Sequence, residues 1–275
     1  MSALPLPESQ LLDPAVVPPA LVTALAAVFG LLLGSFLNVC ISRWGAEPKL
    51  SVRNPPRSRC PKCAYEIRWY DNVPVVSWLL LGARCRGCRA PISAQYPLVE
   101  LATAVIWGYL AWRFGATLEA LRGAVFATIL LGITMTDFNS YIIPDEFSVG
   151  GLALGLLFAL LGGLPELGQA LLGAAVGFGL LWLVGAAGTW VFKQDAMGGG
   201  DVKMMAMVGA FLGWQGVLLT VFLGALLGTI VFLPLLLAGS KKLVPFGIFL
   251  GIGAFATYLV GPAILGWYAG YLQGV

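Results

Sequence analysis

The chain has 275 residues, of which 59% are hydrophobic and 11% are charged, and its formal net charge is only +3. About a quarter of the residues in an ordinary soluble domain are charged, so this composition excludes a water-soluble globular protein. The chain contains no histidine. Ser-His-Asp and Cys-His catalysis and every histidine-ligated metal site are therefore excluded, which leaves carboxylates, cysteine, lysine or a Ser-Lys pair for hydrolytic chemistry.

Apolar runs predict an all-α polytopic membrane protein with about eight transmembrane helices. The first run follows an N-terminal segment without a basic residue, so we expect a retained helix rather than a cleaved signal peptide. The sixth run is short. The predicted spans are 20–42, 97–114, 118–137, 146–163, 166–192, 201–213, 214–238 and 245–272.

Basic residues predict the orientation of these spans. Ten of the sixteen lie within 43–96, which places that stretch in the cytoplasm and the N-terminus in the periplasm, because cytoplasmic loops are enriched in Lys and Arg. The expected domains are an N-terminal segment with the first helix (1–42), a small cytoplasmic insert (43–96) and a transmembrane core (97–275). Four further lysines fall at or beside connections that a count of eight spans puts in the cytoplasm: Lys193, Lys203, Lys241 and Lys242.

Two CxxC pairs, Cys60/Cys63 and Cys85/Cys88, lie in the cytoplasmic stretch, with 21 residues between them. Each pair can present two thiolates from a tight turn, and two such turns complete a tetrahedral zinc site. Disulfides or free thiols are the alternative, which a reducing cytoplasm disfavours. Four protein ligands would fill the coordination shell, so the expected zinc is structural. Cys40, in the first span, is expected to be a packing residue.

Two aspartates fall at the ends of predicted spans that face the same side of the membrane. Asp137 closes the third span, and Asp201 opens the sixth after a run of glycines. A carboxylate at that depth is costly and is a candidate for function. Two carboxylates that share a proton can hydrolyse an amide, one as base toward water and the other as acid toward the carbonyl. The alternative is that each merely caps a helix end.

Short motifs follow one another in a defined order through most of the chain. Gly198-Gly199-Gly200-Asp201 fits the GxGD signature of intramembrane aspartyl proteases. The other motifs are Gly34-Ser35-Phe36-Leu37-Asn38-Val39, Ser58-Arg59-Cys60-Pro61-Lys62-Cys63, Ile67-Arg68-Trp69-Tyr70-Asp71-Asn72-Val73-Pro74, Ser77-Trp78-Leu79, Ala90-Pro91-Ile92-Ser93, Tyr96-Pro97-Leu98-Val99-Glu100-Leu101, Asp137, Ile143-Pro144-Asp145, Gly200-Asp201-Val202-Lys203 and Val244-Pro245-Phe246-Gly247.

This ordered set resembles the bacterial type IV prepilin peptidase family, which also serves type II secretion. The resemblance implies an inner-membrane enzyme with Asp137 and Asp201 as its catalytic pair. It also implies two activities: cleavage of the basic leader of prepilins or pseudopilins after a glycine, and N-methylation of the new terminus with S-adenosylmethionine. The alternatives are a GxGD protease of other specificity and an ion-coupled transporter with a zinc-ribbon domain.

We expect the methyl donor to bind near the cytoplasmic ends of the first two spans. A carboxylate can offset its sulfonium charge, and an aromatic ring can stack or make a cation–π contact. Purely structural roles are the alternative for Asn38 and Glu100. Of two other charged residues, Lys203 is expected to reach the membrane surface and Asp145 to cap the fourth span. The candidate donor-binding residues are Asn38, Arg43, Trp69, Tyr70, Asp71 and Glu100.

Overall fold

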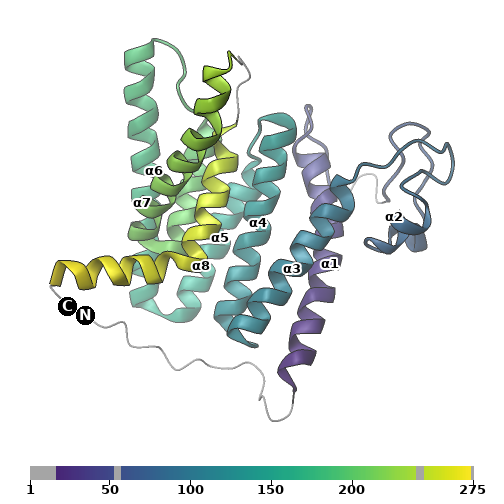
Figure 1. Ribbon diagram of the computed structural model, residues 1–275, viewed down its shortest axis with the longest axis horizontal. Coiled ribbons are helices and arrows are strands. Elements are labelled where there is room, and N and C mark those ends of the chain that lie inside the picture. Colours follow the sequence, from purple (N-terminus) through teal and green to yellow (C-terminus); the bar gives the residue numbers. More distant parts are fainter. Residues whose placement is uncertain (1–16, 53–56, 240–244, 274–275) are drawn as a thin grey trace. The chain divides into compact units, whose positions relative to one another are not determined.

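A computed structural model describes residues 17–52, 57–239 and 245–273 of the protein. The expected periplasmic N-terminus and the basic residues Arg53, Lys241 and Lys242 lie outside these residues. The described chain contains two isolated β-bridges, no strand, and these helices (Figure 1): α1 (Pro19–Trp44), the 3-10 helix η1 (Trp69–Asn72), α2 (Val76–Leu80), α3 (Gln95–Phe114), α4 (Leu118–Ser140), α5 (Asp145–Gly162), α6 (Leu164–Phe192), α7 (Gly199–Leu237) and α8 (Phe246–Gln273).

The prediction of an all-α membrane protein is confirmed. Within the described residues, six helices are long and apolar enough to cross a membrane: α1, α4, α5, α6, α7 and α8. Helix α3 has 20 residues and is not one of the six; it carries Glu100 and Arg113. The count of eight spans is therefore approximate.

Helix α7 consists of two arms that meet at Gly213, where φ is 69° and ψ is 177°. Along the first arm, Met204 lies beside Gly251 of α8. Along the second arm, Gly228 lies beside Phe249, and the Thr220 and Thr257 hydroxyls are hydrogen-bonded. Residue numbers thus increase along α8 in the direction in which they decrease along α7. The second arm is therefore antiparallel to α8. The sequence predicted this division, into spans 201–213 and 214–238.

Two compact units make up the chain, Met1–Thr128 and Ile129–Val275. In the first unit, α1 packs against α3 through two glycines one turn apart. A methyl group added at Gly30 or Gly34 would lie 2.8 Å from the Thr103 carbonyl oxygen or 2.7 Å from the Glu100 Cα atom. Small residues at this spacing let helix backbones approach closely in a membrane.

The second unit uses the same device between α6 and α7. A methyl group at Gly173 would lie 2.2 Å from the Gly209 carbonyl oxygen, and one at Gly177 would lie 2.0 Å from the Met205 carbonyl oxygen. The first arm of α7 is consequently held against α6 along its backbone. Because Asp201 belongs to the first turn of this arm, that packing fixes the position of its Cα atom.

Candidate active site and cofactor sites

Asp137 and Asp201 come together in the second unit. Asp137 lies in the last turn of α4, and Asp201 lies in the first turn of α7, which begins after Gly198. The N-cap position is occupied by Gly198, so Asp201 is an acidic residue of the first turn and not the N-cap. The first turn of a helix favours a negative charge, because its backbone N–H groups point toward it.

The two carboxyl groups are close enough for a direct electrostatic interaction. Asp137 is 6% exposed and accepts backbone hydrogen bonds from Gly247 and Ile248 at the start of α8. One oxygen of each carboxyl, Oδ2 of Asp137 and Oδ1 of Asp201, is buried without a hydrogen-bond partner among the described residues. Buried acceptors without partners are rare, and here they belong to groups able to bind water or a substrate amide.

Glycine residues lie close to both carboxyl groups of this pair. A methyl group at Gly247 would lie 2.6 Å from Asp137 Oδ2, and one at Gly198 would lie 3.3 Å from Asp201 Oδ2. Ile143 fills the space beside Gly200 and Gly247. Only glycine at position 247 leaves the Asp137 carboxyl where it stands.

The expectation that Asp145 caps the fourth span is wrong. Pro144 occupies the N-cap position of α5, and Asp145 is the first residue of the helix. Its carboxylate instead binds Lys203 of α7, with distances of 2.8 Å and 3.0 Å from Nζ to the two oxygens. This contact joins the start of α5 to the helix that carries Asp201. The sequence alone did not predict this ion pair, because the two residues are 58 positions apart.

The four cysteines of the CxxC pairs form one cluster. Their sulfur atoms all lie within 4.8 Å of one another, and the closest pairs, Cys60–Cys88 and Cys63–Cys85, are 3.8 Å and 3.9 Å apart. A disulfide requires about 2.05 Å between sulfurs. Four sulfurs at about 2.3 Å from a tetrahedral metal lie ~3.8 Å from one another, so the cluster fits a metal ion.

Equivalent backbone turns build the two halves of this cluster. In the first, the Cys60 N–H donates to the Tyr65 carbonyl oxygen and the Ala64 N–H donates to the Cys60 carbonyl oxygen. Cys85, Ala90 and Arg89 repeat the pattern, and Ala64 and Arg89 both have positive φ. Backbone N–H groups of Lys62 and Cys63 lower the pKa of the Cys60 thiol to about 6, which favours the thiolate that a metal binds.

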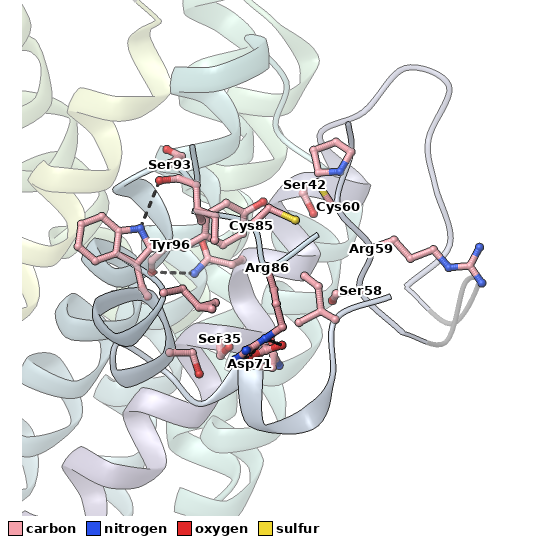
Figure 2. A pocket seen from close by; sticks show the side chains of 18 of the residues that line it. Ser35, Ser42, Ser58, Arg59, Cys60, Asp71, Cys85, Arg86, Ser93 and Tyr96 are labelled. Atoms are coloured by element: carbon pink, nitrogen blue, oxygen red, sulfur yellow. Dashed lines mark hydrogen bonds and ion pairs between the residues drawn. The ribbon is translucent and has the colours of Figure 1, made fainter. Parts of the chain in front are cut away.

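A cavity of about 430 Å³ lies between α1, the insert and α3 (Figure 2). Asn38, Arg43, Asp71 and Glu100 line it, four of the six residues expected at the donor site. Its size is within the range of small-molecule sites.

Polar groups in the wall of the cavity lack partners among the described residues. The Asn38 amide donates to the carbonyl oxygens of Gly34 and Tyr96, at 3.2 Å and 3.0 Å, but its own Oδ1 is buried and accepts nothing. The buried hydroxyl of Tyr65 is also unpaired. Glu100 Oε2 accepts the Val75 N–H at 2.7 Å. Unsatisfied acceptors and donors in a pocket fit a polar ligand.

Trp69 and Tyr70 do not line this cavity. They line a second one of about 600 Å³, which Arg43 also borders. Arg43 donates to the carbonyl oxygens of Ser51 and Val52, at 3.0 Å and 2.7 Å, so it also holds the start of the insert.

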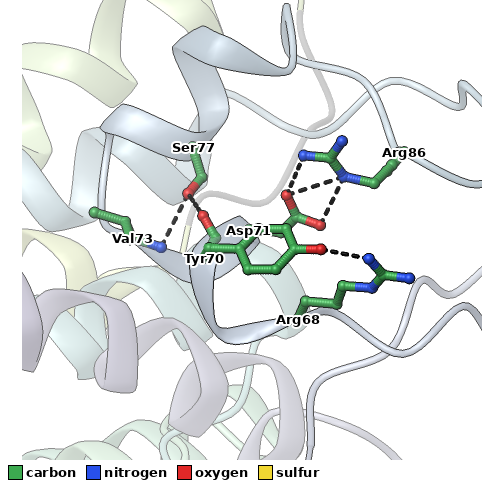
Figure 3. A network of polar contacts seen from close by, with 6 residues as sticks. All are labelled: Arg68, Tyr70, Asp71, Val73, Ser77 and Arg86. Carbon is green, nitrogen blue, oxygen red and sulfur yellow. Dashed lines mark hydrogen bonds and ion pairs between the residues drawn. The ribbon is translucent and has the colours of Figure 1, made fainter.

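Figure 3 shows how the segment around Asp71 is held. The Asp71 carboxylate, with only 5% of its side chain exposed, receives three hydrogen bonds of 2.6–3.1 Å from Arg86, which follows Cys85. This contact raises the pKa of Arg86. Arg86 thus connects the second CxxC turn to the cavity wall. Nothing in the sequence indicated this ion pair, because Arg86 is one of ten basic residues in the stretch 43–96.

Comparisons with known proteins agree with this arrangement. Residues 28–114 match the bacterial peptidase A24 N-terminal domain, and residues 124–233 match the type IV leader peptidase family. Three similar proteins are named prepilin leader peptidase/N-methyltransferase. They are from Aeromonas hydrophila (38% identical; 91% of this chain and 94% of the relative), Stutzerimonas stutzeri (39%; 90% and 93%) and Pseudomonas aeruginosa (39%; 88% and 91%).

No solved structure matches the chain. The sequence relationship extends over both compact units and includes the segments that carry Asp137, Asp201 and the four cysteines. The chain belongs to the type IV leader peptidase family.

Proposed function

We propose that the protein cleaves the basic leader of type IV prepilins or pseudopilins after a glycine and then N-methylates the new terminus with S-adenosylmethionine. The observation that carries the proposal is the pairing of Asp137 with Asp201, each with a buried oxygen that makes no hydrogen bond among the described residues. The related proteins are named for these two activities.

Cleavage requires both members of the pair. One carboxylate accepts a proton from water, which attacks the scissile carbonyl carbon, while the other carboxyl donates a proton to the carbonyl oxygen. The C–N bond then breaks as the amine takes a proton from the pair. The N–H groups of Gly247 and Ile248, which donate to Asp137, hold that carboxyl in place during these steps. No histidine or catalytic metal is needed.

Methylation is assigned to the 430 Å³ cavity. S-adenosylmethionine supplies a methyl group on a positively charged sulfur, which the new terminal amine takes up. Glu100 offers negative charge to the donor, and Asn38 Oδ1 offers a free acceptor to its amine groups, while Asp71, paired with Arg86, forms part of the wall. Arg43 lies on the border with the second cavity, where Trp69 and Tyr70 provide aromatic faces for the substrate or donor.

Zinc is the metal we assign to Cys60, Cys63, Cys85 and Cys88. Four thiolates on two CxxC turns favour it, and four protein ligands leave no open position for catalysis. The sulfur distances support this assignment. Its role is structural: it holds together an insert with few buried apolar residues.

The charge distribution supports a multi-pass protein of the bacterial inner membrane with the zinc domain in the cytoplasm and the N-terminus in the periplasm. We retain 1–42, 43–96 and 97–275 as its functional divisions. Leader cleavage would then occur at the cytoplasmic face, where a prepilin keeps its basic leader.

Intact-mass analysis tests the proposal directly. Purified protein in detergent is incubated with a prepilin, with and without S-adenosylmethionine, beside Asp137→Asn and Asp201→Asn. Wild type should remove the leader and add one methyl only when the donor is present. Each variant should slow cleavage at least about a thousand-fold, since both carboxyls act in one step. Full cleavage by either variant, or none by folded wild type, contradicts the proposal.

A further inference from the structure

Residues 69–80, which comprise η1, the following loop and α2, form a segment we call the apolar hook. Six of its side chains are exposed although they are apolar or aromatic. They are Trp69 (82%), Tyr70 (40%), Val73 (39%), Val76 (49%), Leu79 (64%) and Leu80 (83%). Such a patch is unusual on a surface that faces water.

The Asp71 and Ser77 side chains of the hook bond within the protein, whereas Asn72 is exposed. Ser77, 7% exposed, donates to the Tyr70 carbonyl oxygen at 2.8 Å and accepts the Val73 N–H at 2.9 Å (Figure 3). The Val75 N–H donates a hydrogen bond to Glu100. Asp71, the only charged residue of the hook, forms an ion pair with Arg86. These contacts pair the Val73 and Val75 N–H groups and the Ser77 and Asp71 side chains within the protein, as lipid requires of polar groups.

The position of the hook along α1 gives its depth. Val75 binds Glu100, and the Glu100 Cα atom packs against Gly34. Helix α1 has 26 residues, or roughly 39 Å at 1.5 Å per residue, against a hydrocarbon core of about 30 Å. With α1 centred in the bilayer, Gly34 lies roughly 10 Å inside the hydrocarbon. In the view of Figure 1, α2 lies level with the middle of α1 rather than beyond its end.

The surface of the hook is continuous with side chains of α1 at the same depth. Leu32 and Phe36, 56% and 53% exposed, line the second cavity together with Trp69, Tyr70 and Pro74. The basic residues Arg43, Arg57 and Arg68 line the same cavity. Because α1 is a candidate membrane span, this shared surface continues the one that α1 presents to lipid.

We infer that the apolar hook dips into the cytoplasmic leaflet and presents Trp69, Leu79 and Leu80 to lipid, so that the zinc-binding insert is partly a membrane-embedded unit. The inner side of the same segment contributes Asp71, Ser77 and Trp78 to the 430 Å³ cavity. The hook is therefore the wall between that cavity and the bilayer. This inference refines the expectation that all of 43–96 lies in the cytoplasm.

Depth-dependent quenching tests the inference on the full-length protein. An environment-sensitive fluorescent amino acid is placed at Leu80, in vesicles of phosphatidylethanolamine and phosphatidylglycerol that contain 5-doxyl-phosphatidylcholine. Two exposed positions serve as references: Leu25 in the candidate span α1 (58% exposed) for lipid and Arg57 (71% of its side chain exposed) for water. Zinc content and prepilin cleavage check that each labelled protein is folded.

Lipid nitroxide should quench the label at Leu80 to within a factor of about two of the label at Leu25, and aqueous iodide should quench it far less than the label at Arg57. Iodide quenching equal to that at Arg57, without lipid quenching, overturns the inference and makes the patch a water-facing docking surface for another protein. If the Leu80 label prevents folding, Trp69 carries it with the same two outcomes. Neither result depends on whether the protein methylates its product.

Discussion

Gly247 is the residue on which the position of the Asp137 carboxyl depends. Its Cα atom lies so close that an added methyl group would be 2.6 Å from Oδ2, whereas a methyl group at Gly199 would meet nothing within 4 Å. Gly247→Ala should slow leader cleavage about 10- to 100-fold, since a shift of about 1 Å in a catalytic group has that effect. Gly199→Ala is the matched control and should keep the wild-type rate in the same mass assay. Equal rates for the two variants would show that Asp137 does not need this space.

Glu100 supplies negative charge to the wall of the donor cavity while its Oε2 holds the hook through Val75. Glu100→Gln keeps an acceptor oxygen and the side-chain shape but removes the charge. The dissociation constant for S-adenosylmethionine, measured by calorimetry, should rise about ten-fold, as expected when a partly screened charge pair is lost. Glu119→Gln, at a half-exposed position of α4, is the control. Unchanged affinity in Glu100→Gln would remove this carboxylate from the donor site.

At the scale of helices, the close approach of α6 and α7 holds Asp201 in place. A methyl group at Gly177 would lie 2.0 Å from the Met205 carbonyl oxygen, and one at Gly179 would meet nothing within 4 Å. Gly177→Ala should lower the free energy of unfolding by about 1–3 kcal/mol because the helices must separate. Gly179→Ala should leave it unchanged or raise it by up to about 1 kcal/mol, since alanine is the better helix former. Denaturant titration in detergent compares the two; equal loss in both would contradict the close packing.

The zinc-binding insert is expected to serve the donor cavity more than the aspartate pair. Arg86, beside Cys85, holds Asp71 in the cavity wall, whereas Asp137 and Asp201 belong to the other compact unit. Removing zinc with a chelator should therefore weaken donor binding at least about ten-fold and leave cleavage within about three-fold, because the metal stabilises the fold of the insert alone. Cys88→Ser should reproduce this result, and Cys40→Ala, outside the cluster, should keep bound zinc. Equal loss of both activities would show that the metal also supports the protease.

Sequence patterns predicted the elements whose signal is local. Apolar runs gave the helices, the glycine at 213 fell at a predicted boundary, and the spacing of the CxxC pairs predicted the cluster. Contacts between distant residues could not be read in this way. The ion pairs of Lys203 with Asp145 and of Arg86 with Asp71 join segments that are distant in the sequence, so they depend on the tertiary fold. Hydropathy also gave no sign of the hook, since its apolar run is too short to span a bilayer.

For the whole molecule, the division into two compact units bears on how two activities share one chain. The aspartate pair lies within Ile129–Val275, and the cavity assigned to the methyl donor lies within Met1–Thr128. The two family matches, over 28–114 and 124–233, fall almost entirely on these same units. The two reactions should therefore be separable by single substitutions, one in each unit.

The most direct test of separate cleavage and methylation sites compares the product masses from an intact and a pre-cleaved substrate. Asp137→Asn and Glu100→Gln are each supplied with S-adenosylmethionine and either an intact prepilin or a mature pilin with a free N-terminus. Asp137→Asn should leave the intact prepilin uncut yet methylate the mature one at the wild-type rate. Glu100→Gln should cut the prepilin but methylate either product more slowly at limiting donor. If a folded Asp137→Asn protein fails to methylate the mature pilin, the two activities share one site and their assignment to separate units is wrong.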